Sequence, residues 1–107
     1  MKLFDFDPKE VISLDKVLHE PARLAIVACL AVVEEMDFVF LQNQTGMTGG
    51  NLSSHIRKLE DKAYVSVHKE FREGKPRTSL KLTEEGRREF RQYIRTTRKL
   101  LSEFGEL

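Results

Sequence analysis

The side chains best suited to recognise a ligand lie on one face of a helix that the sequence predicts after Thr48. Thr48 suits the N-cap position, and apolar residues then recur at intervals of four, three and four, at Leu52, Ile56, Leu59 and Ala63. The outward and flanking positions are small or polar, and together with Thr48 they are the residues expected to contact the ligand: Gly50, Asn51, Ser53, Ser54, Arg57 and Lys58.

This polar face has the chemistry to read nucleic acid. An asparagine pairs through two hydrogen bonds with adenine, an arginine does so with guanine, and a serine suits a base or a phosphate. Because Gly49 and Gly50 carry no side chain, a phosphate could approach the free N–H groups at the start of the helix. The alternative is a solvated polar face, which every surface helix has.

A basic hairpin is predicted directly after this helix. The segments 64–69 and 78–82 alternate in hydrophobicity, and the polar residues 72–77 between them predict a turn of about six residues. Arg72, Lys75 and Arg77 would lie at or near its tip, where they suit contacts with phosphates or a minor groove that position a protein but specify little. The alternative is an edge hairpin that its charges keep soluble.

The preceding elements would hold this helix in place. Residues 1–13 are acidic and aromatic, with Pro8 as a breaker, and are expected to form an arm, followed by a helical turn at 14–18. A buried helix is predicted from Pro21 and Ala22 to about Glu35, and a second, short helix from Phe38 to near Gly46. A very short third strand near Phe38 could join the hairpin. Helix, Gly-containing turn and helix, in that order, form a helix-turn-helix unit.

The last predicted helix, capped by Thr83, is longer than a compact core needs. The core would use it to about Ile94, yet apolar positions continue to Phe104, opposite a face rich in arginine. A second copy is the simplest cover for such a stripe, in a two-fold contact with the Leu3–Phe6 arm folded over it. The residues expected to mediate this homodimer are Ile94, Thr97, Leu100, Leu101 and Phe104.

Composition and charge exclude several classes of protein. With 40% hydrophobic and 33% charged residues the chain is expected to fold, and its longest apolar run, near 24–33, is too short to span a membrane. No signal peptide is evident, so a cytoplasmic location is expected. Residues 1–47 hold four Lys/Arg against eight Asp/Glu, whereas residues 48–77 hold seven against four. A polyanion would therefore meet the second half of the chain, although this distribution also fits an ordinary mixed surface.

Neither catalysis nor metal binding is indicated. Ser53, Ser54 and His55 are adjacent in one helix, so their side chains diverge, and no glycine-rich phosphate loop follows a strand. A single cysteine, Cys29, and scattered histidines offer no metal-ligand spacing, so we expect no enzyme, no metal and no cofactor. Cys29 is interpreted as a small buried hydrophobe rather than a redox sensor, and His55 as a packing or capping residue rather than a ligand. Arg23 suits either a phosphate or an acidic partner.

The sequence resembles the winged-helix domains of MarR-type and ArsR-type transcriptional regulators over roughly residues 12–104. The segments that carry the resemblance are 21–26, 37–41, Gly50–Glu60 and the string Leu-Thr-Glu-Glu-Gly at 82–86. The resemblance implies a dimeric cytoplasmic regulator that docks its third helix in the major groove and its wing beside the backbone. The thiolates of the metal-sensing ArsR branch are absent from the recognition helix.

These observations predict a mainly α fold with a small β-hairpin, a winged helix-turn-helix with N- and C-terminal helices for dimerisation. We expect an arm at 1–13, a winged-helix core at 14–82 and a dimerisation helix at 83–107, which together bind double-stranded DNA. The alternative is a winged helix used as a protein-interaction module, because fold does not fix function. RNA binding would lack the usual surface aromatics. The sequence identifies no small-molecule effector, and a sensor pocket would form only between the end helices or at the dimer interface.

Overall fold

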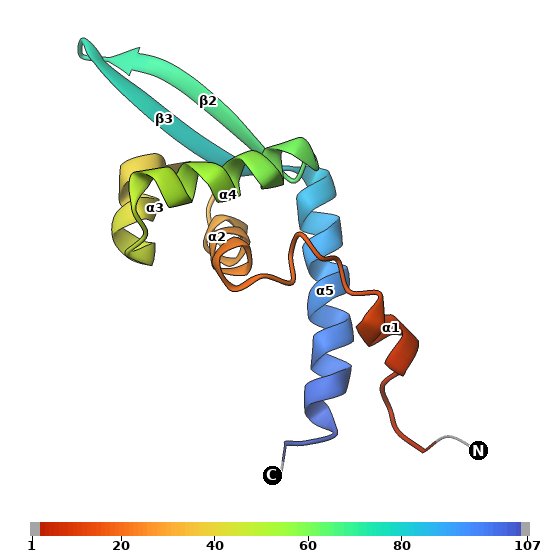
Figure 1. The fold of residues 1–107 in the computed structure, drawn as a ribbon. Coiled ribbons are helices and arrows are strands. Elements are labelled where there is room, and N and C mark those ends of the chain that lie inside the picture. Colours follow the sequence, from red (N-terminus) through yellow and green to blue (C-terminus); the bar gives the residue numbers. More distant parts are fainter. Residues whose placement is uncertain (1–2, 106–107) are drawn as a thin grey trace.

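The computed structural model describes residues 3–105, which form five helices and a three-stranded sheet (Figure 1). In chain order the elements are α1 (Pro8–Ile12), α2 (Pro21–Ala31), β1 (Met36–Asp37), α3 (Phe38–Thr45), α4 (Gly49–Asp61), β2 (Val65–Arg72), β3 (Lys75–Leu82) and α5 (Glu84–Ser102). The strand order is β1-β3-β2, with both pairs antiparallel. This arrangement confirms the predicted winged helix, and β1 is the short third strand expected near Phe38.

One core joins the three central helices to the base of the sheet. Its fully buried side chains come from the loop before α2 and from α2, α3, α4, β2 and β3: Leu18, Ile26, Val27, Leu30, Leu41, Leu52, Leu59, Val65 and Leu80. Burial of each such side chain contributes about 1.5–3 kcal/mol, which is why the helix-turn-helix holds a fixed position against the sheet.

Side-chain caps and one glycine set the helix-turn-helix boundaries. Asp37 caps α3 by accepting from the N–H of Phe40, and Thr48 caps α4 by accepting from the N–H of Asn51 at 3.2 Å. Between the two helices Gly46 has φ 72°, a left-handed conformation that favours glycine. The predicted short helix, turn and N-cap at Thr48 are therefore confirmed.

Several predicted boundaries are wrong. The helix predicted to reach Glu35 ends at Ala31, because β-branched Val32 and Val33 and then two acidic residues disfavour its continuation. Residues 8–12, predicted to belong to an arm without helix, form α1, since Asp7 caps it and Pro8 takes the first helical position, where proline is favourable.

The inward stripe of α4 is also shorter than predicted. Leu52, Ile56 and Leu59 are buried, but Ala63 lies beyond the helix, exposed, with φ 63°. The N–H of Ala63 donates to the carbonyl of Glu60 and the N–H of Tyr64 to that of Leu59, which forms a Schellman motif. This motif turns the chain from α4 directly into β2.

A glycine fixes the start of α5 against the same turn. Thr83 caps α5 by accepting from the N–H of Gly86, as predicted, and its own hydroxyl donates to the carbonyl of Ala63. A Cβ on Gly86 would come within 2.2 Å of the carbonyl oxygen of Tyr64. The glycine of the Leu-Thr-Glu-Glu-Gly string therefore permits α5 to pack directly on the end of α4.

Beyond this junction α5 projects away from the rest of the molecule. Its lower half in Figure 1 is flanked by α1, and the segment before α1 reaches the end of α5, where the ring centroids of Phe6 and Phe104 lie 6.4 Å apart. The overall dimensions are 64 × 26 × 22 Å, so the molecule is strongly elongated.

Candidate nucleic-acid interface

The polar face of α4 is exposed along its whole length. Every residue predicted for this face lies at the surface, namely Thr48, Gly50, Asn51, Ser53, Ser54, Arg57 and Lys58. The hydroxyl oxygen of Thr48 accepts the N-cap hydrogen bond and keeps its own O–H as a donor. All seven residues therefore remain available to a partner.

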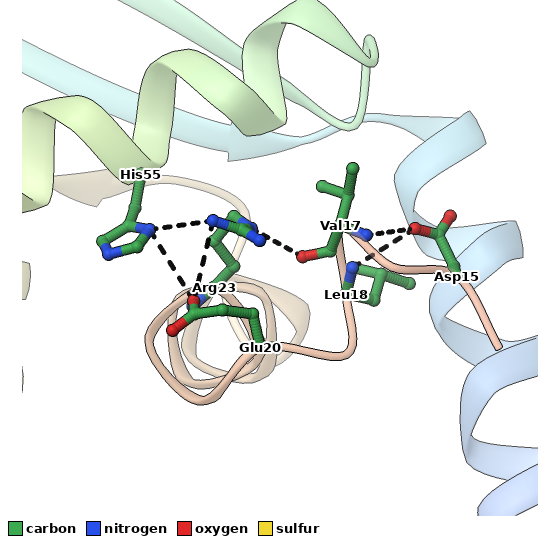
Figure 2. A network of polar contacts seen from close by, with 6 residues as sticks. All are labelled: Asp15, Val17, Leu18, Glu20, Arg23 and His55. Atoms are coloured by element: carbon green, nitrogen blue, oxygen red, sulfur yellow. Dashed lines mark hydrogen bonds and ion pairs between the residues drawn. The ribbon is translucent and has the colours of Figure 1, made fainter.

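These exposed residues form three neighbouring rows rather than one surface. Ser53 and Arg57 lie on the row that turns toward the hairpin. Asn51 and Lys58 share a row with His55, since the three are spaced by four and three residues, and His55 turns toward α2 (Figure 2). Ser54 lies between the two rows and points outward.

A groove runs between α4 and the sheet. It has a volume of about 600 Å³, a floor made partly by Ile56, Val67 and Leu80, and polar side chains along its rim. Those polar residues come from both walls: Ser53, Arg57, Glu60, Lys69 and Thr78. The groove therefore places two cations, one from the helix and one from the hairpin, along the same channel.

Lys69 and Thr78 were not among the residues predicted for the site. Their Cα atoms are register partners in the β2–β3 pair, so both side chains stand on one face of the hairpin. The signal was present in the sequence, because residues two apart in a strand share a face and Lys69 follows Val65 and Val67 at that spacing.

The hairpin is longer and its turn tighter than predicted. The expected six-residue turn is wrong: β2 and β3 pair as far as Arg72 and Lys75, leaving a two-residue turn. Glu73 and Gly74 both have positive φ, 54° and 78°, as a turn that matches the strand twist requires.

The three predicted wing cations lie on the other face of the hairpin from Lys69. The register pairs Arg72 with Lys75 and Arg77 with Glu70, which places all of them on the face that alternates with the groove wall. Two of them are engaged: Arg72 lies 3.1 Å from Glu70, and Arg77 lies 3.4 Å from Asp37. Among the ion pairs of residues 3–105, Lys75 takes no part.

A polar network holds α4 against the start of α2 (Figure 2). The guanidinium of Arg23 donates to the carbonyl of Val17 at 2.7 Å and lies 3.1 Å from His55 Nδ1. Glu20 accepts from the N–H of Arg23, which lowers the pKa of Glu20, although burial opposes this shift. Arg23, for which the sequence left two roles open, lies 3.8 Å from the carboxylate of Glu20 within the chain, and His55 takes part in the same network.

The same loop is tied to β2 and α5. Asp15 accepts from the N–H groups of Val17 and Leu18 and from the hydroxyl of Tyr64. Burial and then this hydrogen bond raise the pKa of Tyr64. His19 Nδ1 lies 2.9 Å from the hydroxyl of Tyr93 on α5. The loop before α2 therefore contacts the polar-face helix at one end and the long terminal helix at the other.

The predicted dimerisation residues lie along the projecting part of α5. Ile94, Thr97 and Leu100 are half-buried, whereas Leu101 and Phe104 are 67% and 48% exposed. A shallow hollow of about 420 Å³ lies over Ile94, Thr97 and Leu101. Phe6 of the N-terminal segment lies 6.4 Å from Phe104 between ring centroids, so this segment covers the end of its own α5.

Other parts of the described chain bear on the remaining expectations. Cys29 is half-buried against the core. Within residues 3–105 no three acidic, histidine or cysteine side chains gather to hold a metal ion, and no helix is long and apolar enough to cross a membrane. A hollow of about 290 Å³ lies between the end helices, beside Glu10, Asp15 and Tyr93. This hollow lies where the sequence analysis placed a sensor pocket, for which no effector was identified.

Comparison with known sequences identifies a protein family for this chain. Residues 22–101 match the family model of a winged helix DNA-binding domain, which is a class of DNA-binding modules rather than of enzymes. An uncharacterised protein of Methanocaldococcus jannaschii is 34% identical over 79 residues, which cover 74% of this chain and 86% of that protein.

Solved structures share the same fold. A transcriptional regulator homologue from Pyrococcus horikoshii OT3 superposes with a TM-score of 0.85 at 29% identity, covering 92% of this chain and 99% of that one. The transcriptional repressor BigR from Xylella fastidiosa gives 0.60 at 27% identity, covering 80% and 82%. The transcriptional regulator BldR from Sulfolobus solfataricus gives 0.70 at 17% identity, covering 92% and 72%, and shows the fold alone.

Proposed function

We propose that this chain, which belongs to the winged helix DNA-binding domain family, binds double-stranded DNA sequence-specifically as a homodimer and so regulates transcription. One observation carries the proposal: the polar face of α4 and the groove beside it are exposed and cationic, and a projecting hairpin continues from the groove. A regulator homologue and a repressor at 29% and 27% identity add support. A cytoplasmic location is part of this proposal.

In this proposal α4 enters the major groove. Asn51 and Arg57 read base edges, because both side chains can form paired hydrogen bonds with one base. Ser53 and Ser54 contact a base or a phosphate, and Gly50 lets the helix start approach the backbone. Lys58 adds a phosphate contact at the far end of the same face, and Thr48 caps the start of the helix.

The DNA backbone then crosses the groove between α4 and the hairpin. Lys69 and Thr78 on the hairpin wall suit phosphate contacts there, opposite Arg57. Of the three predicted wing cations, Lys75 is the most available, since Arg72 and Arg77 are paired with carboxylates. We therefore expect Lys75 to contribute more to binding than Arg72 or Arg77.

A second copy completes the proposed DNA-binding unit. One recognition helix reads too few base pairs for useful specificity, whereas two helices about 34 Å apart read a palindrome on one face of the duplex. The projecting half of α5 offers the two-fold contact, through Ile94, Thr97, Leu100, Leu101 and Phe104.

The decisive experiment is a fluorescence-anisotropy titration of duplexes selected from a random-sequence library, at two salt concentrations. We expect enrichment of a palindromic sequence and an affinity that falls steeply with salt, as counterion release requires. Single-stranded DNA and an RNA duplex of the enriched sequence serve as controls and should bind more weakly. Absent or salt-independent binding would overturn the proposal in favour of a winged helix that binds a protein partner.

A further inference from the structure

An apolar pair occupies the exposed end of the hairpin. Phe71 on β2 and Pro76 on β3 are register partners one pair away from the last strand pair before the turn. Phe71 is 78% exposed, more than any other phenylalanine of residues 3–105, and lies outside the core. Because it lies outside the core, its side chain contributes little to folding and is free to contact a partner.

This pair continues the face of the hairpin that lines the groove. Residues two apart share a face, so Phe71 follows Val67 and Lys69, while Pro76 precedes Thr78 and Leu80. The four residues other than the pair all line the groove beside α4. From Val67 to Phe71 the strand advances about 13 Å, which carries the pair beyond the groove.

The hairpin around this pair carries a net positive charge. Along the paired strands the groove-side face carries Lys69 and no carboxylate, whereas the opposite face carries four cations, Arg72, Lys75, Arg77 and Lys81, against the single carboxylate of Glu70. A polyanion would therefore be attracted to either face of the hairpin, and the apolar pair would be presented to it among cations.

We propose, on the basis of the function proposed above, that Phe71 and Pro76 form an apolar wedge that enters the minor groove next to the half-site and partly unstacks a base step. Phenylalanine and proline are among the residues that proteins insert between base steps, where they kink the duplex. Lys69 on the same face and Lys75 on the opposite face suit contacts with the phosphates that flank the wedge. A flexible pyrimidine–purine step would accept it at the lowest cost, so the wedge adds a sequence preference at a position that α4 does not reach.

The test uses the full chain and its library-selected duplex with 2-aminopurine placed at successive steps flanking the half-site. Binding of the wild-type protein should raise the fluorescence of one flanking position, because unstacking relieves quenching. Phe71→Ala should abolish that rise and weaken binding about fivefold to 100-fold, the range for losing one aromatic–base contact. The slope of affinity against salt should stay unchanged, because no phosphate contact is lost.

Matched variants separate this role from others. Val32→Ala removes an apolar side chain of similar exposure, 81%, elsewhere in the molecule and should change neither readout. Phe71→Leu should retain part of the fluorescence rise, since leucine is also an effective wedge. Unchanged affinity and fluorescence in Phe71→Ala would overturn the wedge while leaving the proposed function intact. A Phe71→Ala protein that changed only its oligomeric state would do the same. Failure of the wild-type chain to bind any duplex would instead overturn the proposed function.

Discussion

Arg23 Nη1 lies 3.1 Å from His55 Nδ1, and this contact joins the first turn of α2 to the middle of α4. Since the guanidinium only donates, His55 Nδ1 accepts, which assigns the ring proton to Nε2. The carboxylate of Glu20, at 3.6 Å from the same nitrogen, would require the opposite role, and the shorter distance favours Arg23. Arg23, which lies on α2 and outside the polar face of α4, thus helps to position α4.

We expect Arg23→Ala to lower the free energy of unfolding by about 1–3 kcal/mol. The substitution removes the donor from two acceptors, the carbonyl oxygen of Val17 and Nδ1 of His55. Arg23→Lys should recover only part of this loss, since an ammonium cannot serve both acceptors in the same geometry. Denaturant unfolding measures the change. A double-mutant cycle with His55→Ala should give a coupling of at least about 0.5 kcal/mol, and additive effects would show that the contact is unimportant.

Glu20 predicts a pH dependence of stability in the acid range. Its pKa is held below the ordinary value of 4.5, chiefly by the N–H of Arg23, so the folded state favours the carboxylate. The stabilisation is complete above that ordinary value and is lost as the pH falls through the lowered value of the folded state. Glu20→Gln should therefore lose stability at neutral pH and show a flatter decline on acidification than the wild-type chain. Parallel curves for the two proteins would contradict this assignment.

Gly86 predicts a steric requirement at the junction of α4 and α5. Gly86→Ala should destabilise the fold by about 2 kcal/mol or more, because the added methyl would lie 2.2 Å from the Tyr64 carbonyl, and backbone must move to admit it. Gly50→Ala is the matched control, since no atom lies within 4 Å of its added methyl. In a helix that change should stabilise by about 0.5–1 kcal/mol. Equal melting behaviour of the two variants would refute the packing argument.

The order of elements was predictable because local signals and burial agree. Thr48, Gly46 and Thr83 each act where their types are favoured, at an N-cap, a left-handed turn and an N-cap. The prediction for Ala63 failed because its spacing fits the buried stripe of α4, whereas the Schellman motif places it beyond the end of the helix. Glycine is the usual residue at that position of the motif, so an alanine there does not indicate the end of a helix.

The faces of the hairpin were harder to predict than its existence. Charged residues near a glycine suggested a loop at 72–77, but cross-strand pairing continues through them and shortens the turn to two residues. The longer pairing adds Arg72, Lys75 and Arg77 to the strands, on the face away from the groove, and it turns Arg77 toward Asp37. The face of Lys69 follows from its spacing with Val65 and Val67, whereas the faces of the three cations depend on a turn length that the sequence did not indicate.

Substitutions in α4 and in the hairpin should have different effects on DNA binding. Asn51→Ala or Arg57→Ala should each cost about 1–3 kcal/mol and relax the preference at one base position. Lys69→Ala or Lys75→Ala should weaken all sequences similarly and reduce the salt slope by about one. Lys9→Ala, an exposed lysine on α1, is the control and should change neither property. A change in sequence preference with the hairpin lysines, but not with Asn51 or Arg57, would reverse these assignments.

The projecting half of α5 predicts a dimer that a single substitution should separate. Leu101 is 67% exposed in one copy, so Leu101→Glu should leave the unfolding of the monomer nearly unchanged while placing two carboxylates in the two-fold contact. Sedimentation of the wild-type chain at micromolar concentration should give a dimer, and that of the variant a monomer with much weaker binding to a palindrome. Deletion from Thr97 onward should have the same effect, since the buried Thr96 and Tyr93 are retained.

The control for this prediction lies on the charged side of the same helix. Arg88→Glu changes charge at an exposed position in the second turn of α5 and should leave the dimer intact. It also separates loss of association from a general effect of negative charge, which would weaken DNA binding in both variants. A wild-type monomer that still binds a palindrome tightly would mean that the apolar stripe serves another purpose. Because Phe6 covers only the end of the stripe, the half-buried Ile94 and Thr97 and the exposed Leu101 would then have to serve a different protein partner or a hydrophobic ligand.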